Sequence, residues 1–225
     1  MIVQAATINF PLRQVCNISK IRYGGGMTPE GLRERKKRET RLALSHATIR
    51  LAMERGLDNV SVEDIAAAAN VSERTFRNYF GSKAEAVVAA QVERGQRIAE
   101  VLRERRADEP LWDALAAAVV AQFEPAESRP GSAGFAGALQ KLLAEPAVQH
   151  EVFRAHAKAQ DELTAAIAER TGTEATDLYP QIVASVVSAG LGTTMAHWTR
   201  APDRSLVSLL REVFDQLRAG LPGPR

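Results

Sequence analysis

Residues 61–83, with the sequence SVEDIAAAANVSERTFRNYFGSK, contain two helix-start signals within one short block. Ser61 is followed three positions later by Asp64, a spacing typical of a capped helix N-terminus, and Ser72 provides a second capping residue. Asn70, between the two, tolerates the left-handed backbone conformation of a tight turn. The alanines of the first segment leave room for another helix to cross closely. We therefore predict two short helices that meet at a tight turn.

The second of these helices has two different faces. Phe76 and Phe80, four residues apart, are predicted to point inward, whereas the polar residues around them lie largely on the outside. Arginine can donate two hydrogen bonds to guanine, asparagine pairs with adenine, and threonine contacts the thymine methyl group or a phosphate. The pattern favours a helix-turn-helix that binds DNA; the alternative is an exposed helix with ordinary polar residues. The candidate contact residues are Arg74, Thr75, Arg77 and Asn78.

Basic residues crowd just before and within the first predicted helix. Residues 31–50 carry seven basic side chains against two acidic ones, although the whole chain has a formal net charge of only +2. A run of this kind on its own is often a solvated helix face. Because a helix-turn-helix follows directly, we expect contacts with DNA phosphates, with Lys37 and Arg38 as candidate residues.

Periodicity along the chain predicts an all-α protein of about nine helices. Apolar residues recur at helical spacing in successive segments, and alternating strand patterns and hairpin dipeptides are absent. Glycine and proline mark most of the segment ends. The expected helices span residues 28–54, 61–69, 72–80, 82–105, 110–124, 135–145, 147–172, 178–201 and 205–220.

Several classes of protein are excluded by residue usage. Cys16 is the only cysteine, so an internal disulfide is impossible, and the four scattered histidines have no metal-ligand spacing; we expect no metal and no cofactor. No apolar run approaches the ~20 residues of a membrane-spanning helix, which favours a soluble, cytoplasmic protein without membrane association. Residues 1–30 lack secretory features. We interpret them as a disordered or mis-assigned extension with Met27 as the native start; the alternative is a genuine disordered arm.

Residues 84–221 are predicted to form a second domain, because they contain more apolar helical surface than a DNA-binding domain of residues 31–83 could cover. Helical bundles of this kind can enclose a ligand between facing helices. The alternative is that the large apolar residues are ordinary core. The candidate pocket residues are Trp112, Phe123, Phe135, Leu139, Leu143, Phe153, Met195 and Trp198.

The last two helices are predicted to form a two-fold dimer interface. Ala184, Ser188 and Gly192 are spaced four apart on one face, which lets helices approach closely, and the final helix has an apolar stripe. The alternative is that both helices pack within one subunit. A dimer would place two recognition helices about one DNA turn apart, ~34 to 36 Å, and read a near-palindromic operator in double-stranded DNA.

The block GLDNVSVEDIAAAANVSERTFRNYFGSKAEAV resembles the N-terminal DNA-binding domain of the tetracycline-repressor (TetR) family of bacterial regulators. The resemblance covers about residues 36–88 and includes DIA in the second helix, VS in the turn, TFxxYF in the recognition helix and SK at the start of the fourth. It implies base or phosphate contacts from the four polar recognition-helix residues and backbone contacts from Ser61, Tyr79 and Lys83. Many family members carry an aromatic residue where this chain has Arg77, so a base, a phosphate or both remain partners for Arg77.

The segment LLAEPAVQHEVFRAHAKAQDELTAAIAERTG and the helix after it resemble regulators associated with mycofactocin and acyl-coenzyme A sensing. This resemblance implies a small apolar effector, with a fatty acyl-coenzyme A as the candidate. We therefore expect a homodimeric repressor, not an enzyme, that leaves its operator when the effector binds. Two alternatives are an architectural DNA-binding protein without an effector and an all-α enzyme that uses His156 with Glu151 or Asp161.

Overall fold

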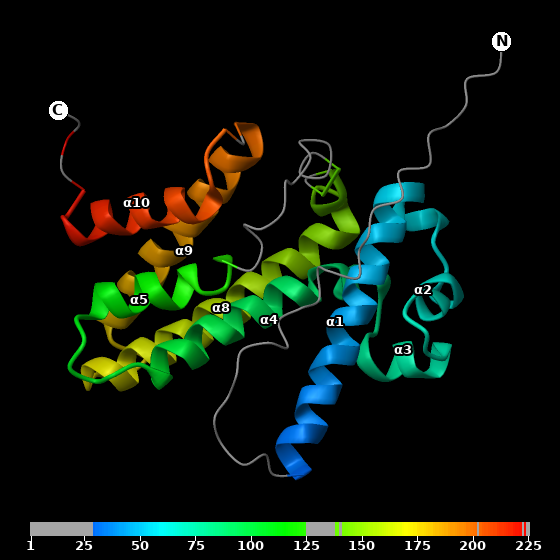
Figure 1. The fold of residues 1–225 in the computed structure, drawn as a ribbon, viewed down its shortest axis with the longest axis horizontal. Helices are drawn as coiled ribbons and strands as arrows, with labels where there is room; N and C mark the ends of the chain where they lie inside the picture. Colours follow the sequence, from blue (N-terminus) through cyan, green and yellow to red (C-terminus); the bar gives the residue numbers. More distant parts are fainter. Residues whose placement is uncertain (1–28, 125–137, 140, 202, 222, 224–225) are drawn as a thin grey trace.

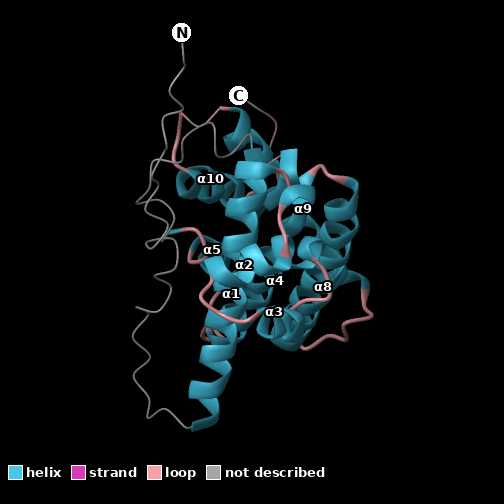
Figure 2. Cartoon of the chain, turned by 90° about the vertical axis from the view of Figure 1, so that its right-hand side faces the viewer, coloured by secondary structure: helices cyan, strands magenta, loops and turns pink. Residues whose placement is uncertain are grey.

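The computed structural model describes residues 29–124, 138–139, 141–201, 203–221 and 223. Within these residues the chain forms eight α-helices with complete bounds, one 3-10 helix, a further helical stretch at residues 138–139 and 141–143, and no strand (Figure 2), so the all-α prediction is confirmed. Residues 1–28 and residues 125–137, which include the predicted pocket residue Phe135, lie outside the described part. The elements are α1 (Pro29–Arg55), η3 (Leu57–Asn59), α2 (Val62–Ala68), α3 (Glu73–Tyr79), α4 (Lys83–Glu104), α5 (Leu111–Val120), α8 (Pro146–Thr171), α9 (Leu178–Arg200) and α10 (Leu206–Arg218).

The two helix starts predicted in residues 61–83 form as expected. The Ser61 hydroxyl accepts a hydrogen bond from the Asp64 N–H at 3.0 Å, and the Asp64 carboxylate accepts one from the Ser61 N–H at 3.0 Å. The Ser72 hydroxyl caps α3 in the same way, by accepting from the Thr75 N–H at 3.1 Å. Asn70 in the intervening turn has a φ of 55°, the left-handed conformation expected for it. These caps satisfy amides that have no partner inside the helices.

Two other helix ends have different geometries. At the start of α4, Ser82 accepts from the Glu85 N–H at 3.0 Å, and the Glu85 carboxylate accepts from the Gly81 N–H at 2.8 Å, so Ser82 and Glu85 do not form a reciprocal capping box. Gly56 after α1 has φ 80° and ψ 143°, a positive φ without the ψ of a left-handed helix cap. Gly172 after α8, with φ 68° and ψ 30°, is such a cap.

The helix-turn-helix is built on a small aromatic core. Phe76 and Phe80 are 2% and 3% exposed, and their ring centroids are 5.5 Å apart. The Arg41 guanidinium lies over the Phe80 ring at 4.6 Å and donates to the Tyr79 carbonyl at 3.1 Å, which fixes the end of α3 against α1. Ala86 and Ala89 of α4 belong to the same buried cluster. The first turns of α4 are therefore part of the DNA-binding domain.

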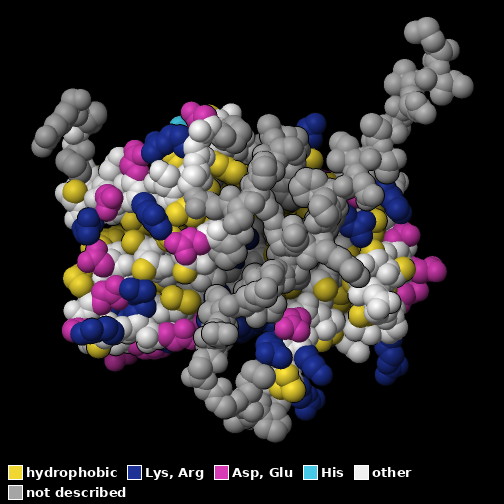
Figure 3. Space-filling model, in the orientation of Figure 1, with side chains coloured by type: hydrophobic (Ala, Val, Ile, Leu, Met, Phe, Trp, Pro, Cys, Tyr) yellow, Lys and Arg dark blue, Asp and Glu magenta, His cyan; other side chains and the backbone are white. Residues whose placement is uncertain are grey.

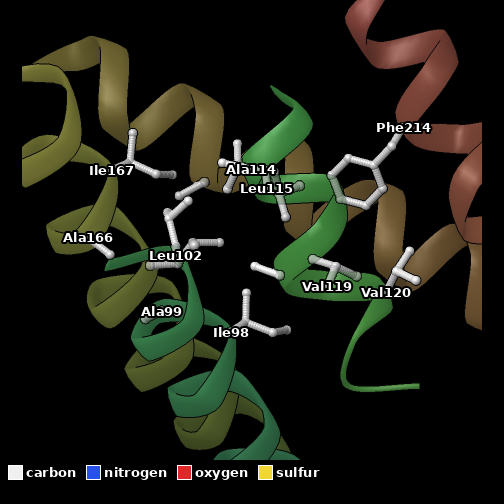
Figure 4. Close-up of a cluster of buried hydrophobic side chains, with 14 of the residues drawn as sticks. Ile98, Ala99, Leu102, Ala114, Leu115, Val119, Val120, Ala166, Ile167 and Phe214 are labelled. Atoms are coloured by element: carbon white, nitrogen blue, oxygen red, sulfur yellow. The ribbon is translucent and has the colours of Figure 1, made fainter. Parts of the chain in front are cut away.

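The remaining helices surround a second core. In Figure 1, α4 leaves the group formed by α1, α2 and α3 and runs beside α8 toward α5, α9 and α10. Side chains from these five helices meet there, including Ile98, Leu102, Leu115, Val119 and Phe214 (Figure 4). A third buried cluster joins α1, α4 and α8 between the two cores. All three buried clusters therefore include residues of α4.

Helices α4 and α8 cross at very close range beside Gly95. A Cβ atom at position 95 would lie 2.6 Å from the Cβ of Ala159 in α8, a separation that side chains do not adopt. Glycine is unfavourable in the middle of a helix by about 1 kcal/mol relative to alanine. Its presence in α4 is explained by this crossing.

We predict that Gly95→Ala lowers the free energy of unfolding by roughly 1–3 kcal/mol, because the overpacked crossing outweighs the better helix propensity of alanine. Chemical denaturation measures the change. Gly192→Ala is the matched control, since no heavy atom lies within 4 Å of a Cβ at this position in α9. A Gly95→Ala protein as stable as the Gly192→Ala protein would show that the helices separate without cost.

Candidate DNA interface and effector domain

Helix α3 presents a polar face to solvent above its buried phenylalanines. Arg74, Arg77 and Asn78 are exposed, while Phe76 on the opposite side is buried. Arg77 pairs with Glu73 one turn earlier at 3.0 Å, and the Arg77 side chain remains 68% exposed. An exposed pair of this kind contributes little stability and can exchange its partner for a nucleic-acid acceptor. Thr75 is half-buried and its hydroxyl lies 2.9 Å from that of Ser72.

The residues predicted to contact the DNA backbone make contacts within the chain itself. The ammonium group of Lys83 donates to the carbonyl oxygens of Leu57 and Val60, each at 2.7 Å, so the side chain fastens the connection between α1 and α2 to the start of α4. The Ser61 hydroxyl also donates to the Asp64 carboxylate at 2.7 Å. Tyr79 is half-buried beside the aromatic core. The resemblance did not indicate the structural use of Lys83, because carbonyl acceptors leave no mark in a sequence.

The basic run of α1 separates into free and paired residues. Lys37 is exposed, and Figure 3 shows Lys and Arg side chains gathered around the lower part of α1. Arg38, in contrast, points to α4, where its guanidinium lies 2.6 Å from Glu93 and 3.4 Å from Glu100. Arg38 therefore links two helices of the same chain, while its side chain stays 46% exposed, and its phosphate contact stays a prediction.

The Arg38–Glu93 pair is partly withdrawn from water. The Glu93 side chain is 17% exposed, and burial raises the pKa of its carboxyl group above the usual value while the nearby charge of Arg38 opposes that rise. Arg41 adds a second link between α1 and α4, at 3.6 Å from Glu85. Partly buried ion pairs are screened less by salt than exposed ones. These pairs join the DNA-binding domain to the helix that enters the second core.

The predicted pocket residues have different positions in the structure. Phe123 belongs to the second core, and Trp112 and Met195 pack on its edge. Leu139 and Trp198 are half-buried, Leu143 packs on the cluster between the two cores, and Phe135 lies outside the described residues. Phe153 does not fit: it is 74% exposed, because α8 turns Val148, Val152 and Ala155 toward the interior and Phe153 away from it.

Two open grooves lie on the second domain. The larger, of about 610 Å³, follows the turn between α4 and α5 and is lined mainly by charged residues from Glu104 to Glu109. The smaller, of about 160 Å³, lies between α5 and α10 and includes Trp112 and Phe214. Its rim carries the Arg218–Asp113 ion pair at 2.8 Å. Of the predicted pocket residues that the structure describes, only Trp112 lines either groove.

The small-residue stripe of α9 packs mainly inside the subunit. Ala184 is fully buried in the second core, and the Ser188 hydroxyl donates to the Gln160 side chain of α8 at 2.7 Å. Gly192 is exposed. The alternative of packing within one subunit is therefore correct for most of this stripe. A different face of α9 is open and apolar, with Leu178, Tyr179 and Ile182 at 73%, 52% and 50% exposure.

Arg94 is a functional candidate that the sequence analysis missed. Its guanidinium lies over the Phe123 ring at 4.9 Å, and the residue is half-buried. Burial lowers the pKa of Arg94 below its usual range. No pattern in the sequence distinguishes it from the other arginines of α4, because the difference lies in the tertiary environment.

Within the described residues, no cluster of histidine, cysteine or acidic side chains could hold a metal ion. None of the helices found there has the length and apolar character needed to cross a membrane.

Comparison with known proteins matches two separate parts of the chain, an N-terminal and a C-terminal one. Residues 44–90 match the family described as bacterial regulatory proteins, tetR family, and residues 109–222 match the MftR C-terminal domain. The chain is 28% identical to a protein of Mycobacterium tuberculosis named as the mycofactocin biosynthesis transcriptional regulator MftR, over 83% of this chain and 93% of that protein. It is 27% identical to the HTH-type transcriptional regulator TcmR of Streptomyces glaucescens, over 85% and 88%.

Solved structures show the same fold. The fatty acid degradation regulator FadR from Bacillus halodurans aligns with a TM-score of 0.55 and 16% identity, covering 89% of this chain and all of FadR. SmeT, the repressor of the Stenotrophomonas maltophilia efflux pump SmeDEF, aligns with a TM-score of 0.52 and 18% identity, covering 82% and 96%. The match to the MftR C-terminal domain spans half of the chain, and the DNA-binding match adjoins it. The chain belongs to the TetR family of bacterial transcriptional regulators.

Proposed function

We propose that this regulator is a cytoplasmic homodimeric repressor that binds a palindromic operator through α3 and leaves it when a small apolar effector binds the second domain. In this proposal residues 31–83 bind DNA, and residues 84–221 bind the effector and the second subunit. The observation that carries it is the outer face of α3, where Arg74, Arg77 and Asn78 are exposed on a helix held by buried aromatic rings. Donors fixed on a rigid helix suit the base edges of the major groove.

The open face of α9 supports a dimer through the last two helices. Leu178, Tyr179 and Ile182 are large apolar residues that one subunit leaves exposed on a single helix. Contiguous exposed apolar side chains are typical of protein interfaces, and a two-fold interface pairs the same face of both subunits. Pairing across α9 would let the two copies of α3 in a dimer bind one operator.

Helix α4 is the element that would transmit the effector signal. It takes part in the DNA-binding core through Ala86 and Ala89 and in the second core through Ile98 and Leu102. An effector shifts the protein toward a state that does not bind DNA only to the extent that it binds the two states differently. A fatty acyl-coenzyme A is the candidate effector, following the resemblance of the C-terminal region.

The alternatives are weaker. TetR-family proteins are transcriptional regulators, and His156, the group that an enzyme would use, is exposed and lies 3.3 Å from Gln91. An architectural DNA-binding protein would need no second core of this extent behind its helix-turn-helix. Saturable stabilisation by a small molecule in a thermal-shift screen would argue against an architectural protein without an effector.

The test of the function is binding to DNA from the region upstream of its own gene, titrated with and without long-chain acyl-coenzyme A at fixed salt concentration. We expect specific binding of a dimer and release by the ligand. Specific binding that the ligand does not weaken would contradict acyl-coenzyme A as the effector. The absence of specific binding would contradict an operator in this upstream region.

We predict that Ile182→Asp separates the dimer, because a carboxylate in an apolar interface loses its hydration without a partner. The dimer dissociation constant should rise at least ~10-fold, corresponding to about 1.4 kcal/mol, as measured by light scattering. Leu221→Asp is the control, since Leu221 is 64% exposed but lies beyond α10. An Ile182→Asp protein that stays dimeric would place the interface elsewhere.

We predict that substitutions at Arg77 and Lys83 change different properties, namely operator affinity at Arg77 and stability at Lys83. Arg77→Ala should weaken operator binding by about 1–3 kcal/mol and leave the melting temperature unchanged, because Arg77 is exposed and its partner among the described residues is Glu73, in a weak exposed pair. Lys83→Met should lower the free energy of unfolding by about 1–3 kcal/mol, because two carbonyl groups lose their donor.

Thermal melting and operator titrations at several salt concentrations separate the two roles. A Lys83→Met protein with unchanged stability and a salt slope reduced by about 1 would make Lys83 a phosphate contact alone. Unchanged operator affinity in Arg77→Ala would contradict its role in DNA binding.

A further inference from the structure

Arg94 is chemically unlike the other arginines of α4. Arg97 pairs with Glu100 at 2.8 Å, and Arg103 pairs with Glu169 of α8 at 2.7 Å. Arg94, by contrast, has no hydrogen bond or carboxylate partner among the residues that the structure describes, and its contact is the face of the Phe123 ring. It is the arginine of this helix whose charge is left without an anion.

The position of Arg94 makes this unpaired charge costly. The residue is half-buried one turn before Ile98, and both Ile98 and Phe123 belong to the second core. Removing a guanidinium from water is unfavourable unless an anion or hydrogen-bond acceptors replace the solvent. A cation–π contact with Phe123, and the C-terminal end of α5 near it, offset only part of this cost.

We infer that Arg94 binds the charged head of the effector, an organic carboxylate or phosphate. The inference rests on the proposed function, because it specifies the ligand of the second domain. A guanidinium offers paired donors that match the oxygens of either anion. The site therefore selects amphiphilic anions over neutral molecules of the same length.

This site is placed where it can reach the DNA-binding domain. Glu93, the residue before Arg94, forms the 2.6 Å pair with Arg38 of α1. An anion at Arg94 therefore adds its charge next to the link that joins α1 to α4. Any change in the position of α4 on binding acts directly on that link, and through α1 on the helix-turn-helix.

The test compares dodecanoate with dodecanol, which has the same chain without the charge. We expect the full-length protein to bind dodecanoate more tightly, by calorimetry in the absence of DNA. Arg94→Gln should weaken dodecanoate binding roughly 10- to 100-fold, as expected for the loss of a charge-assisted contact. Dodecanol binding should stay within about twofold, because a hydroxyl gains little from the guanidinium. Arg103→Gln, which changes an arginine already paired with Glu169, should leave both unchanged.

Two further variants separate ligand binding from a structural role. Arg94→Met should melt at the same temperature as the wild type or higher without ligand, because an unpaired buried charge is removed. A lower melting temperature with unchanged dodecanoate affinity would make Arg94 a structural residue and overturn the inference. Glu127 is the acid of residues 125–137, which lie outside the described part. If Glu127→Gln strengthened dodecanoate binding, Glu127 would be competing with the ligand for Arg94, and the premise of an unpaired charge would be overturned.

Dodecanoyl-coenzyme A distinguishes the two sources of the anion. An Arg94→Gln loss for dodecanoate alone assigns a carboxylate, and a loss for the coenzyme A ester alone assigns its phosphates. Equal affinity of wild type and Arg94→Gln for both ligands, or no binding of either, would overturn the inference. Failure at Arg94 would leave operator binding intact in every variant, whereas failure of the proposed function would appear as the absence of specific DNA binding in the wild type.

Discussion

Helix α4 packs into two hydrophobic cores, and the rest of the structure depends on this double role. Its first turns carry Ala86 and Ala89 into the core of the helix-turn-helix, and its later turns carry Ile98 and Leu102 into the second core. At Gly95 it lies so close to α8 that there is no space for a methyl group. A close-packed interior transmits displacement because it does not compress. A change in the packing of α4 in one core is therefore felt in the other.

The ion pairs between α1 and α4 hold the two helices in a defined relative orientation. Arg38 pairs with Glu93 and Glu100, and Arg41 contacts Glu85 while it holds the end of α3. Each pair fixes the rotation of α1 relative to α4 more than it stabilises the fold, because the free energy of a partly exposed pair is small. The recognition helix is thus oriented by contacts that a modest movement of α4 can change.

Much of the fold was predictable from local signals in the sequence. The caps at Ser61 and Ser72 and the left-handed Asn70 depend on neighbouring residues, and these local predictions are confirmed. Local signals do not show contacts between residues that are distant in the sequence. The pairing of Arg38 with acids of α4 is one such contact, and its phosphate contact stays a prediction. The outward direction of Phe153 and the burial of Ala184 likewise depend on how whole helices pack, which helical spacing alone does not specify.

Arginine has three different roles in this chain, and its surroundings decide among them. On α3, Arg77 is exposed and held by a weak pair, so in the proposed function a DNA acceptor would replace that pair at little cost. On α1, Arg38 is committed to two carboxylates of α4 and serves to connect helices. On α4, Arg94 is partly removed from water and has no anionic partner among the described residues. It therefore gains the most of the three from binding an anion. The proposed function uses all three states: an exposed charge for DNA, a charge that connects α1 to α4, and a charge for the effector.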